Sequence, residues 1–390
     1  MAPQAVAGTV QRGNPTLKPS DSKTPMHVLW RRIVRTLTGS PKAFTSRADV
    51  VYSKLPRDIG AEITNICNAD CSFCGYGKGP DGKASDARKK GKLELKAFRH
   101  LLRLYSEAGG GHFSLSPILG EITAHPNWME LVREARDTPN VTGVSCFTNA
   151  ILLDRFGYEN ILTSGLTAMS ISTSLGSEEQ YKRLYGVDKY DIVVKNVLGI
   201  LRANAKLGHP VSISLLLRID KPYKPFLESS LYREISEVLA ARQIVILSDF
   251  WDDFHGVIKE DGLPAGHNFK NRDTDKTQPC YAMFRKLQIM TDGKIQACAC
   301  RVEPELWAGN ILDYETLEEA WRNPGLERLR DNWFEGNIPS CCKTCSHYMP
   351  YTTLSDGSRP LAVAQQFSRR VAAKLGITRS PTVEEGQIYD

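Results

Sequence analysis

Short apolar segments alternate with longer amphipathic segments along the chain from residue 57 onward. Six apolar segments have strand length, and five of them are followed by apolar positions at helical spacing. This alternation is typical of an α/β protein with a parallel sheet. Six units are fewer than the eight of a closed TIM barrel, so we predict an open, partial (β/α)6 TIM-like barrel. The predicted strands are 59–66, 112–119, 141–148, 166–173, 211–219 and 244–250, and the predicted helices are 93–109, 127–137, 151–165, 178–186, 191–208 and 225–242.

The pattern changes after residue 260. Residues 263–280 are polar and rich in turn formers, which is typical of a linker. Residues 284–300 read as a hairpin around Asp292-Gly293, and 316–334 as a helix interrupted at Pro324. We therefore predict a barrel domain over 55–260, a small second domain over 261–350, and a tail with a helix over 351–390.

The first 54 residues form an N-terminal extension with a different composition. Residues 1–25 are rich in Pro, Gly, Ser and Thr and show no periodicity, so we expect no fixed structure there. Residues 26–39 place apolar side chains on one helical face and Arg on the other. A helix this short is expected to pack against the main domain rather than to lie on a membrane.

The charge distribution excludes an electrostatic nucleic-acid binder. The chain carries a net +6, but residues 1–54 hold nine Lys/Arg against two Asp, so the remainder sums to −1. No apolar run approaches the ~18 residues that span a bilayer, and the N-terminus lacks the apolar stretch of a secretory signal. We expect a cytoplasmic protein without a membrane span, in which cysteines stay reduced and serve as ligands or catalysts.

Three of the ten cysteines lie within eight positions, in the loop directly after the first predicted strand. The spacing is Cys67-x3-Cys71-x2-Cys74. A zinc site normally uses four ligands, whereas three thiolates on one short loop can hold three irons of a cubane and leave the fourth iron for a chelating cofactor. Phe73, directly before the last cysteine, can pack against an adenine. Zinc-binding or structural thiols are the alternative.

This loop, placed after the first strand of a six-unit barrel, resembles that of the radical S-adenosylmethionine (SAM) superfamily over roughly residues 57–250. The resemblance implies that Cys67, Cys71 and Cys74 hold a 4Fe–4S cluster whose free iron chelates SAM. An electron from the cluster would cleave SAM to methionine and a 5′-deoxyadenosyl radical. A flavodoxin or ferredoxin is the electron donor that the family implies.

Other strand ends are similar to the family's SAM-binding segments. "ILGEITAHP" resembles the Gly-Gly-Glu-Pro segment that receives the SAM amino group, although Leu119 and Ile122 depart from it. The fourth strand lacks the Asp that relatives carry near the SAM ribose, and each polar residue can alternatively cap a helix or turn. The resemblance implies SAM-binding roles for Gly120, Glu121, Asn149, Ser172, Ser174, Ser214 and Arg218, the last suited to a bidentate grip on a carboxylate.

A second group of cysteines follows the barrel. Cys280-x12-Gly293-x4-Cys298 and Cys342-x2-Cys345 resemble the SPASM/twitch extension, and the lack of later cysteines favours the shorter, twitch-like form. The resemblance implies one auxiliary 4Fe–4S cluster on these four cysteines. Cys300 is an alternative to Cys298, Cys341 is an alternative to Cys342, and a structural zinc is an alternative to the cluster.

This layout is similar to that of the twitch-type aminocyclitol dehydrogenase of butirosin biosynthesis, which implies a radical SAM oxidoreductase. The expected reaction is hydrogen abstraction from a polar small molecule (a sugar, aminocyclitol or nucleoside), with the auxiliary cluster accepting an electron. Candidate catalytic residues are Arg218 and the group after the sixth strand, Asp249, Asp252, Asp253 and His255, which is otherwise a solvated loop.

Three other functions stay open. One is the cross-linking or epimerisation of a ribosomally made peptide, which the short N-terminal extension disfavours. Another is sugar epimerisation with a cysteine hydrogen donor, for which Cys146, Cys300 and Cys341 are unassigned. The last is a metal-binding protein that does not cleave SAM. The sequence does not identify the substrate.

Overall fold

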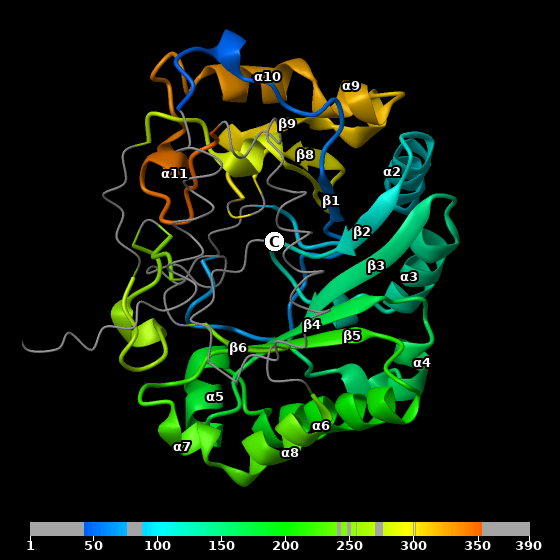
Figure 1. Ribbon diagram of the computed structural model, residues 1–390, viewed down its shortest axis with the longest axis vertical. Helices are drawn as coiled ribbons and strands as arrows, with labels where there is room; N and C mark the ends of the chain where they lie inside the picture. The colour runs from blue at the N-terminus through cyan, green and yellow to red at the C-terminus, as the bar shows by residue number, and fades with distance from the viewer. Residues whose placement is uncertain are drawn as a thin grey trace, which may run out of the picture. The chain divides into compact units, whose positions relative to one another are not determined.

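A computed structural model of the chain is shown in Figure 1. It describes residues 43–75, 88–239, 243–247, 251–254, 256–269, 276–298, 300 and 302–352, all within the compact unit Lys42–Asp390. Several predicted features lie outside the described residues: the extension up to residue 42 with its helix at 26–39, Asp249, His255, and the tail from residue 353. The domain boundaries stay a prediction.

The predicted parallel sheet is confirmed. Strands β1 to β6 are neighbours in sequence order, and every adjacent pair among them is parallel. The β-strands alternate in the chain with the α-helices, as the apolar pattern predicts. The strands are β1 Asp58–Ala61, β2 Gly111–Leu115, β3 Val141–Thr148, β4 Ala168–Thr173, β5 Ser212–Leu217 and β6 Ile244–Ile246.

Helices cover one face of this curved sheet (Figure 1). They bury apolar side chains at helical spacing, such as Phe98, Leu101 and Leu102 in α2. The helices of the barrel are α2 Leu95–Glu107, α3 Trp128–Asp137, α4 Tyr158–Leu162, α5 Glu178–Tyr185, α6 Tyr190–Lys206, α7 Lys224–Leu227 and α8 Ser230–Val238. None of the helices among the described residues is long and apolar enough to cross a membrane.

The second domain continues the barrel's sheet. β7 Lys286–Ile289 pairs in parallel with β1, so that Ile59 lies opposite Leu287. The predicted hairpin around Asp292-Gly293 is confirmed, since β8 Lys294–Gln296 runs antiparallel to β7 and β9 Trp307–Asn310 antiparallel to β8. The domain also contains α9 Leu317–Trp321, α10 Pro324–Asp331 and α11 Ser340–Lys343, with the predicted break at Pro324.

Three predicted elements differ in the structure. The first strand ends at Ala61, because the chain then leaves the sheet and pairs through a single bridge from Thr64 to Lys92. The predicted helix 151–165 is split at Gly157, whose φ of +75° interrupts helical geometry. The predicted helix 225–242 begins anew at α8, where the Ser229 hydroxyl accepts a hydrogen bond from the Tyr232 N–H.

The two faces of the sheet differ in polarity. On β4 and β5 the helix-facing positions, such as Met169 and Leu215, are buried, and the alternate positions on the opposite face are half-buried apart from the exposed Ser212. That opposite face carries hydroxyls from neighbouring strands, because Ser170 pairs with Ser214. The partial barrel therefore presents a polar inner face, reached from the carboxyl ends of its strands.

Candidate functional site

The loop that carries Cys67, Cys71 and Cys74 follows β1 and is fixed by hydrogen bonds from the ends of neighbouring elements. The Glu121 N–H donates to the carbonyl of Ile66 at 2.9 Å, one residue before the first cysteine. The side-chain amide of Asn149 donates to Asn68 Oδ1 at 2.7 Å. The Asp70 N–H donates to the carbonyl of Tyr185, at the carboxyl end of α5, at 3.0 Å. Elements far apart in sequence thus hold one short loop.

Two glycines let the backbone approach this loop closely. Gly120 has a φ of +109°, and a Cβ there would lie 2.5 Å from the carbonyl oxygen of Thr64. Gly186 ends α5 with a φ of +67°, and a Cβ there would lie 2.3 Å from the carbonyl oxygen of Asp70. Both positions require glycine for conformation and for space.

Glu121 is buried, and protein donors occupy its carboxylate. Oε1 accepts hydrogen bonds from the hydroxyls of Thr148 at 2.6 Å and Thr123 at 2.8 Å. Oε2 accepts the backbone N–H of Asn149 at 2.6 Å. Burial raises the pKa of Glu121, and these hydrogen bonds oppose the rise. The carboxylate therefore joins the ends of β2 and β3; its predicted contact with the SAM amino group stays a prediction.

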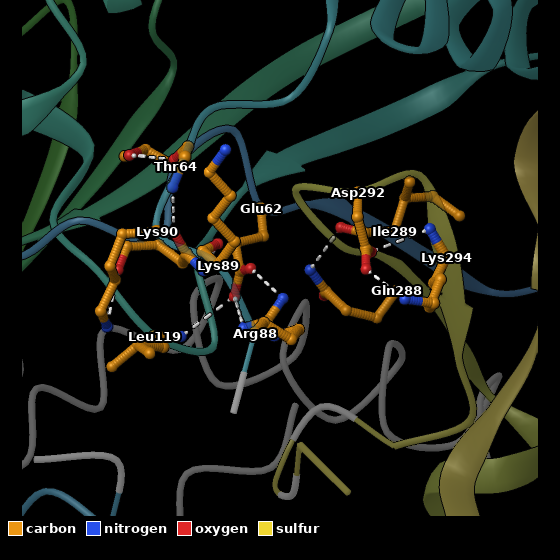
Figure 2. A network of polar contacts seen from close by, with 12 residues as sticks. Glu62, Thr64, Arg88, Lys89, Lys90, Leu119, Gln288, Ile289, Asp292 and Lys294 are labelled. Carbon is orange, nitrogen blue, oxygen red and sulfur yellow. Dashed lines mark hydrogen bonds and ion pairs between the residues drawn. The ribbon is translucent and has the colours of Figure 1, made fainter. Parts of the chain in front are cut away.

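A buried ion pair fixes the segment between β1 and the cluster loop, as Figure 2 shows. Arg88 Nη1 lies 2.6 Å from Glu62 Oε1, and both side chains are almost fully buried. Glu62 Oε2 also accepts the backbone N–H of Leu119 at 3.2 Å, next to Gly120. Burial raises the pKa of Glu62, and Arg88 opposes the rise. The pair holds the β2 loop against the chain that leads to Cys67.

The three thiols of the loop lie within electrostatic range of one another. Burial raises the pKa of Cys67 to about 11 and raises that of Cys71 well above its ordinary value, with the neighbouring thiols contributing to both rises. Within the residues described, no three His, Cys, Asp or Glu side chains meet closely enough to hold a single metal ion. A 4Fe–4S cluster does not need such a meeting point, since each thiolate binds a different iron.

Arg218, the residue directly after β5, places its guanidinium against this loop. Its guanidinium carbon lies 4.4 Å from the ring centroid of Phe73 and 5.8 Å from that of Trp251. Nη1 donates to the hydroxyls of Ser172 at 2.6 Å and Tyr185 at 3.3 Å. Arg218 forms no ion pair with any carboxylate in the described part of the chain, and its Nε is buried without a hydrogen-bond partner there.

Of the remaining predicted SAM-binding residues, Ser172 and Phe73 contact Arg218. Ser172 accepts its hydrogen bond, and Phe73 packs edge-on against the rings of Tyr185 and Trp251 at 5.3 and 5.6 Å. Ser174 is fully buried, and its hydroxyl has no hydrogen-bond partner among the described residues. Ser214 lies on the inner face of β5. Their contacts with SAM stay predictions.

Of the acidic group predicted after β6, the structure describes Asp252 and Asp253. Asp252 is buried, and its Oδ2 accepts hydrogen bonds from both the N–H and the hydroxyl of Ser346 at 2.7 Å. Its Oδ1 accepts the N–H of Phe254 at 2.7 Å. Asp253 is half-buried, while Asp249 and His255 fall outside the described residues. The Asp252 carboxylate therefore contacts the second domain, next to Cys345.

The cysteines of the second group influence one another electrostatically, and their role as cluster ligands stays a prediction. Burial raises the pKa of Cys280 to about 12, and the Cys298 and Cys345 thiols contribute to the rise. The pKa of Cys342 is also raised, by Cys341 and burial and then by Cys298 and Cys280. Four cysteines from three segments thus lie within electrostatic range of this group, a set of thiols that suits a fully ligated 4Fe–4S cluster.

The two alternative cysteines of this group differ. The pKa of Cys300 is raised by Cys298 and burial first, and then by Cys345 and Cys280, so Cys300 lies with the same thiols. Cys341 is buried, and its backbone N–H donates to Glu305 Oε1 at 2.8 Å, while its Sγ lies 4.0 Å from that of Cys342. Cys341 is therefore turned toward Glu305, which favours Cys342 as the ligand.

Both cysteine groups fit iron–sulfur clusters. Each supplies thiols, the ligands that iron–sulfur clusters use. Beside the first group, Arg218 stacks on Phe73 and offers a cation without a carboxylate among the described residues. A small zwitterion with a carboxylate, such as the methionine part of SAM, suits that arrangement.

Sequence reasoning missed several residues of the site. Trp251 and Tyr185 form an aromatic cage with Phe73 around Arg218, and the Asn68 side chain accepts a hydrogen bond from that of Asn149. Trp251 is itself held by a hydrogen bond from its indole N–H to His267 Nδ1 at 3.1 Å. The only signal in the sequence was the position of Trp251 just after a predicted strand, where site residues of such barrels gather.

Two family models match the chain. The model of the radical SAM superfamily matches residues 61–219, and the SPASM model, an iron–sulfur cluster-binding domain, matches residues 280–346. The first match begins at the end of β1 and includes the cluster loop, the β2 loop and Arg218. The second begins at Cys280 and ends just after Cys345.

Among curated proteins, the chain is similar to the GTP 3′,8-cyclase of Haemophilus influenzae, with 24% identity over 197 residues. The match covers 50% of this chain and 56% of the cyclase, so the chain spans little more than half the length of the curated relatives it matches.

Among solved structures, the fold is similar to that of SuiB from Streptococcus suis bound to its precursor peptide SuiA. The TM-score is 0.51 at 14% identity, over 87% of this chain and 80% of SuiB. BtrN in complex with AdoMet and 2-DOIA gives a TM-score of 0.48 at 13% identity, over 77% of this chain and 100% of BtrN, which is too low to bear on function. The chain therefore carries a radical SAM domain over residues 61–219 and a SPASM domain over residues 280–346, which imply a SAM-binding 4Fe–4S cluster, SAM and an auxiliary iron–sulfur cluster.

Proposed function

We propose that the chain is a radical SAM oxidoreductase that abstracts hydrogen from a polar small molecule and completes its oxidation with the auxiliary cluster as electron acceptor. A sugar, an aminocyclitol or a nucleoside is the proposed substrate class. The observation that carries the proposal is the polar inner face of the barrel. The strands that form this face end, at their carboxyl ends, in the segments that contain Arg218 and the cluster loop.

The inner face offers several hydroxyls and few apolar groups. Ser114 pairs with Ser145 between β2 and β3, and Ser170 pairs with Ser214 between β4 and β5. These positions are half-buried, while their neighbours along each strand are mostly buried under the helices. Hydroxyls both donate and accept hydrogen bonds, so this face suits a substrate with several hydroxyl or amino groups. Phe147, 41% exposed, and the half-buried Leu216, which pairs with Ser172, add apolar surface to the same face.

The chain's own residues would bind and orient the reactants. Arg218, held flat by Phe73 and Trp251, would grip the SAM carboxylate with two parallel hydrogen bonds. Asn149 and Glu121 would keep the cluster loop in place through Asn68 and Ile66. When bound, the clusters and SAM would supply a 5′-deoxyadenosyl radical and take up the second electron. Asp253 is the proposed proton acceptor, with Asp249 and His255, its neighbours in sequence, as the alternatives.

The substrate class is tested by stimulation of SAM cleavage. The reconstituted, reduced protein is incubated without oxygen with SAM and with panels of aminocyclitols, sugars, nucleosides and short peptides. We expect a polyhydroxylated compound to raise 5′-deoxyadenosine formation about tenfold or more over the substrate-free rate. We also expect a product two hydrogens lighter than that compound, detected by mass spectrometry.

Two results would contradict the proposal. Stimulation by peptides alone would favour peptide modification. A product that has the mass of its substrate in H₂O, and that gains one deuterium at carbon in D₂O, would favour epimerisation with a thiol hydrogen donor.

A further inference from the structure

The segment 251–254, which follows β6, lies against both cysteine loops. On one side, Trp251 packs edge-on against Phe73 with ring centroids 5.6 Å apart. Phe254 and Cys74 pack against the same small apolar cluster, and the Phe254 ring lies so close to Gly75 that a Cβ there would be 2.1 Å away. Between these two aromatic residues, Asp252 binds the second domain through Ser346. The segment therefore contacts the first cluster loop with its aromatic side chains and the auxiliary loop with its carboxylate.

Each carboxylate oxygen of Asp252 makes a different one of these contacts. Oδ1 accepts the N–H of Phe254 and so fixes the turn that places the Phe254 ring on Gly75. Oδ2 accepts two hydrogen bonds from Ser346, the residue directly after Cys345. Asp252 and Ser346 are both buried, so these charge-assisted hydrogen bonds are shielded from water.

Other charged groups hold the auxiliary loop but come from elsewhere in the chain. Glu305 binds the beginning of α11 at Ser340 and Cys341, and Lys276 donates to the carbonyl of Lys343 at 2.6 Å. Lys276 belongs to the predicted linker, and Glu305 belongs to the second domain. Asp252 thus holds this loop from the barrel side, and it does so beside the last auxiliary cysteine.

We propose that Asp252 is a positioning residue that holds the Cys342–Cys345 loop against the radical SAM cluster loop, so that one segment of the barrel sets the placement of both clusters. This role differs from that of a catalytic base, which the sequence suggested for Asp252. It does not depend on the substrate or on the reaction proposed above.

The test is made in the full chain with Cys67, Cys71 and Cys74 all changed to Ala, so that the bound iron comes from the auxiliary site. Asp252→Asn preserves size but presents an amide to the Ser346 donors. We expect the variant to retain less than half of the iron and sulfide of its parent after anaerobic reconstitution. In the protein before reconstitution, we expect amide hydrogen exchange in 340–352 to rise about tenfold.

Asp261→Asn is the matched control, because Asp261 is exposed and lies nine residues from Asp252 in sequence. It should equal the parent in iron and in exchange. Ser346→Ala removes one of the two hydrogen bonds and should give an intermediate loss. Full iron and unchanged exchange in Asp252→Asn would overturn the proposal. If exchange of β2–β4 showed that Asp252→Asn fails to fold, Ser346→Ala would decide by the same two measurements, and parental values would overturn the proposal.

Discussion

Replacing Arg218 by Met is expected to weaken SAM binding by about 10- to 100-fold. A hydrogen bond to a charged group contributes about 1.5–3 kcal/mol, and tenfold in affinity corresponds to about 1.4 kcal/mol. The guanidinium already stacks on Phe73 and has no carboxylate partner in the described chain, so it is preorganised for an incoming carboxylate. Anaerobic equilibrium dialysis of the reconstituted protein with labelled SAM measures the change.

Two further variants separate the causes of this loss. Arg218→Lys keeps the charge but loses the planar fork, so its affinity should fall between those of the wild type and the Met variant. Arg155→Met removes an exposed arginine at the end of the Leu153–Arg155 turn and should leave SAM binding unchanged. Wild-type affinity in Arg218→Met would show that the cation of Arg218 serves another purpose.

Gly120→Ala is expected to lower the free energy of unfolding by about 2 kcal/mol or more, and to deplete iron at the first cysteine group. The φ of +109° is strained for any residue with a Cβ. The added Cβ would also lie 2.5 Å from the Thr64 carbonyl oxygen and 2.9 Å from the Asn65 Cα, and neither backbone atom can rotate away. The chain that leads to Cys67 must therefore shift. Urea unfolding and iron content measure the two effects.

Gly208→Ala is the matched control for this substitution. Gly208 also has a positive φ, +77°, but an added Cβ there would meet no atom within 4 Å. It should cost only the strain of a left-handed residue, about 1 kcal/mol, and should leave the iron content unchanged. Equal losses of stability and iron in the two variants would show that the close approach at Gly120 does not hold the cluster loop.

Local patterns carried most of the fold prediction. Alternating strands and helices predicted the parallel sheet, and the Asp292-Gly293 turn predicted the hairpin. The pairing of β7 with β1 was not predictable, because it joins segments more than 200 residues apart and leaves no periodic trace in either. The split at Gly157 was likewise missed, since a single glycine inside an apolar pattern is compatible with a continuous helix.

The candidate site, like the fold, could be predicted from the sequence only in part. The candidate ligands of the first cluster could be read from sequence because Cys67, Cys71 and Cys74 lie within eight positions, whereas the second set, spread over residues 280–345, rested on the resemblance to a known domain. The contacts that hold these loops come from distant elements. Asp252 reaches Ser346 across 94 positions, and its sequence context, an acidic run beside a His, is equally typical of a solvated loop. Burial and partners, which sequence does not report, distinguish a positioning carboxylate from an exposed one.

The most direct test of the account is the iron and sulfide content of the reconstituted chain, measured without oxygen for the wild type and for the variant with Cys67, Cys71 and Cys74 all changed to Ala. Both proteins are also assayed for 5′-deoxyadenosine after reduction with SAM. Two 4Fe–4S clusters predict about eight irons per chain in the wild type, about four in the variant, and cleavage of SAM by the wild type alone. About four irons in the wild type, or SAM cleavage that survives in the variant, would contradict it.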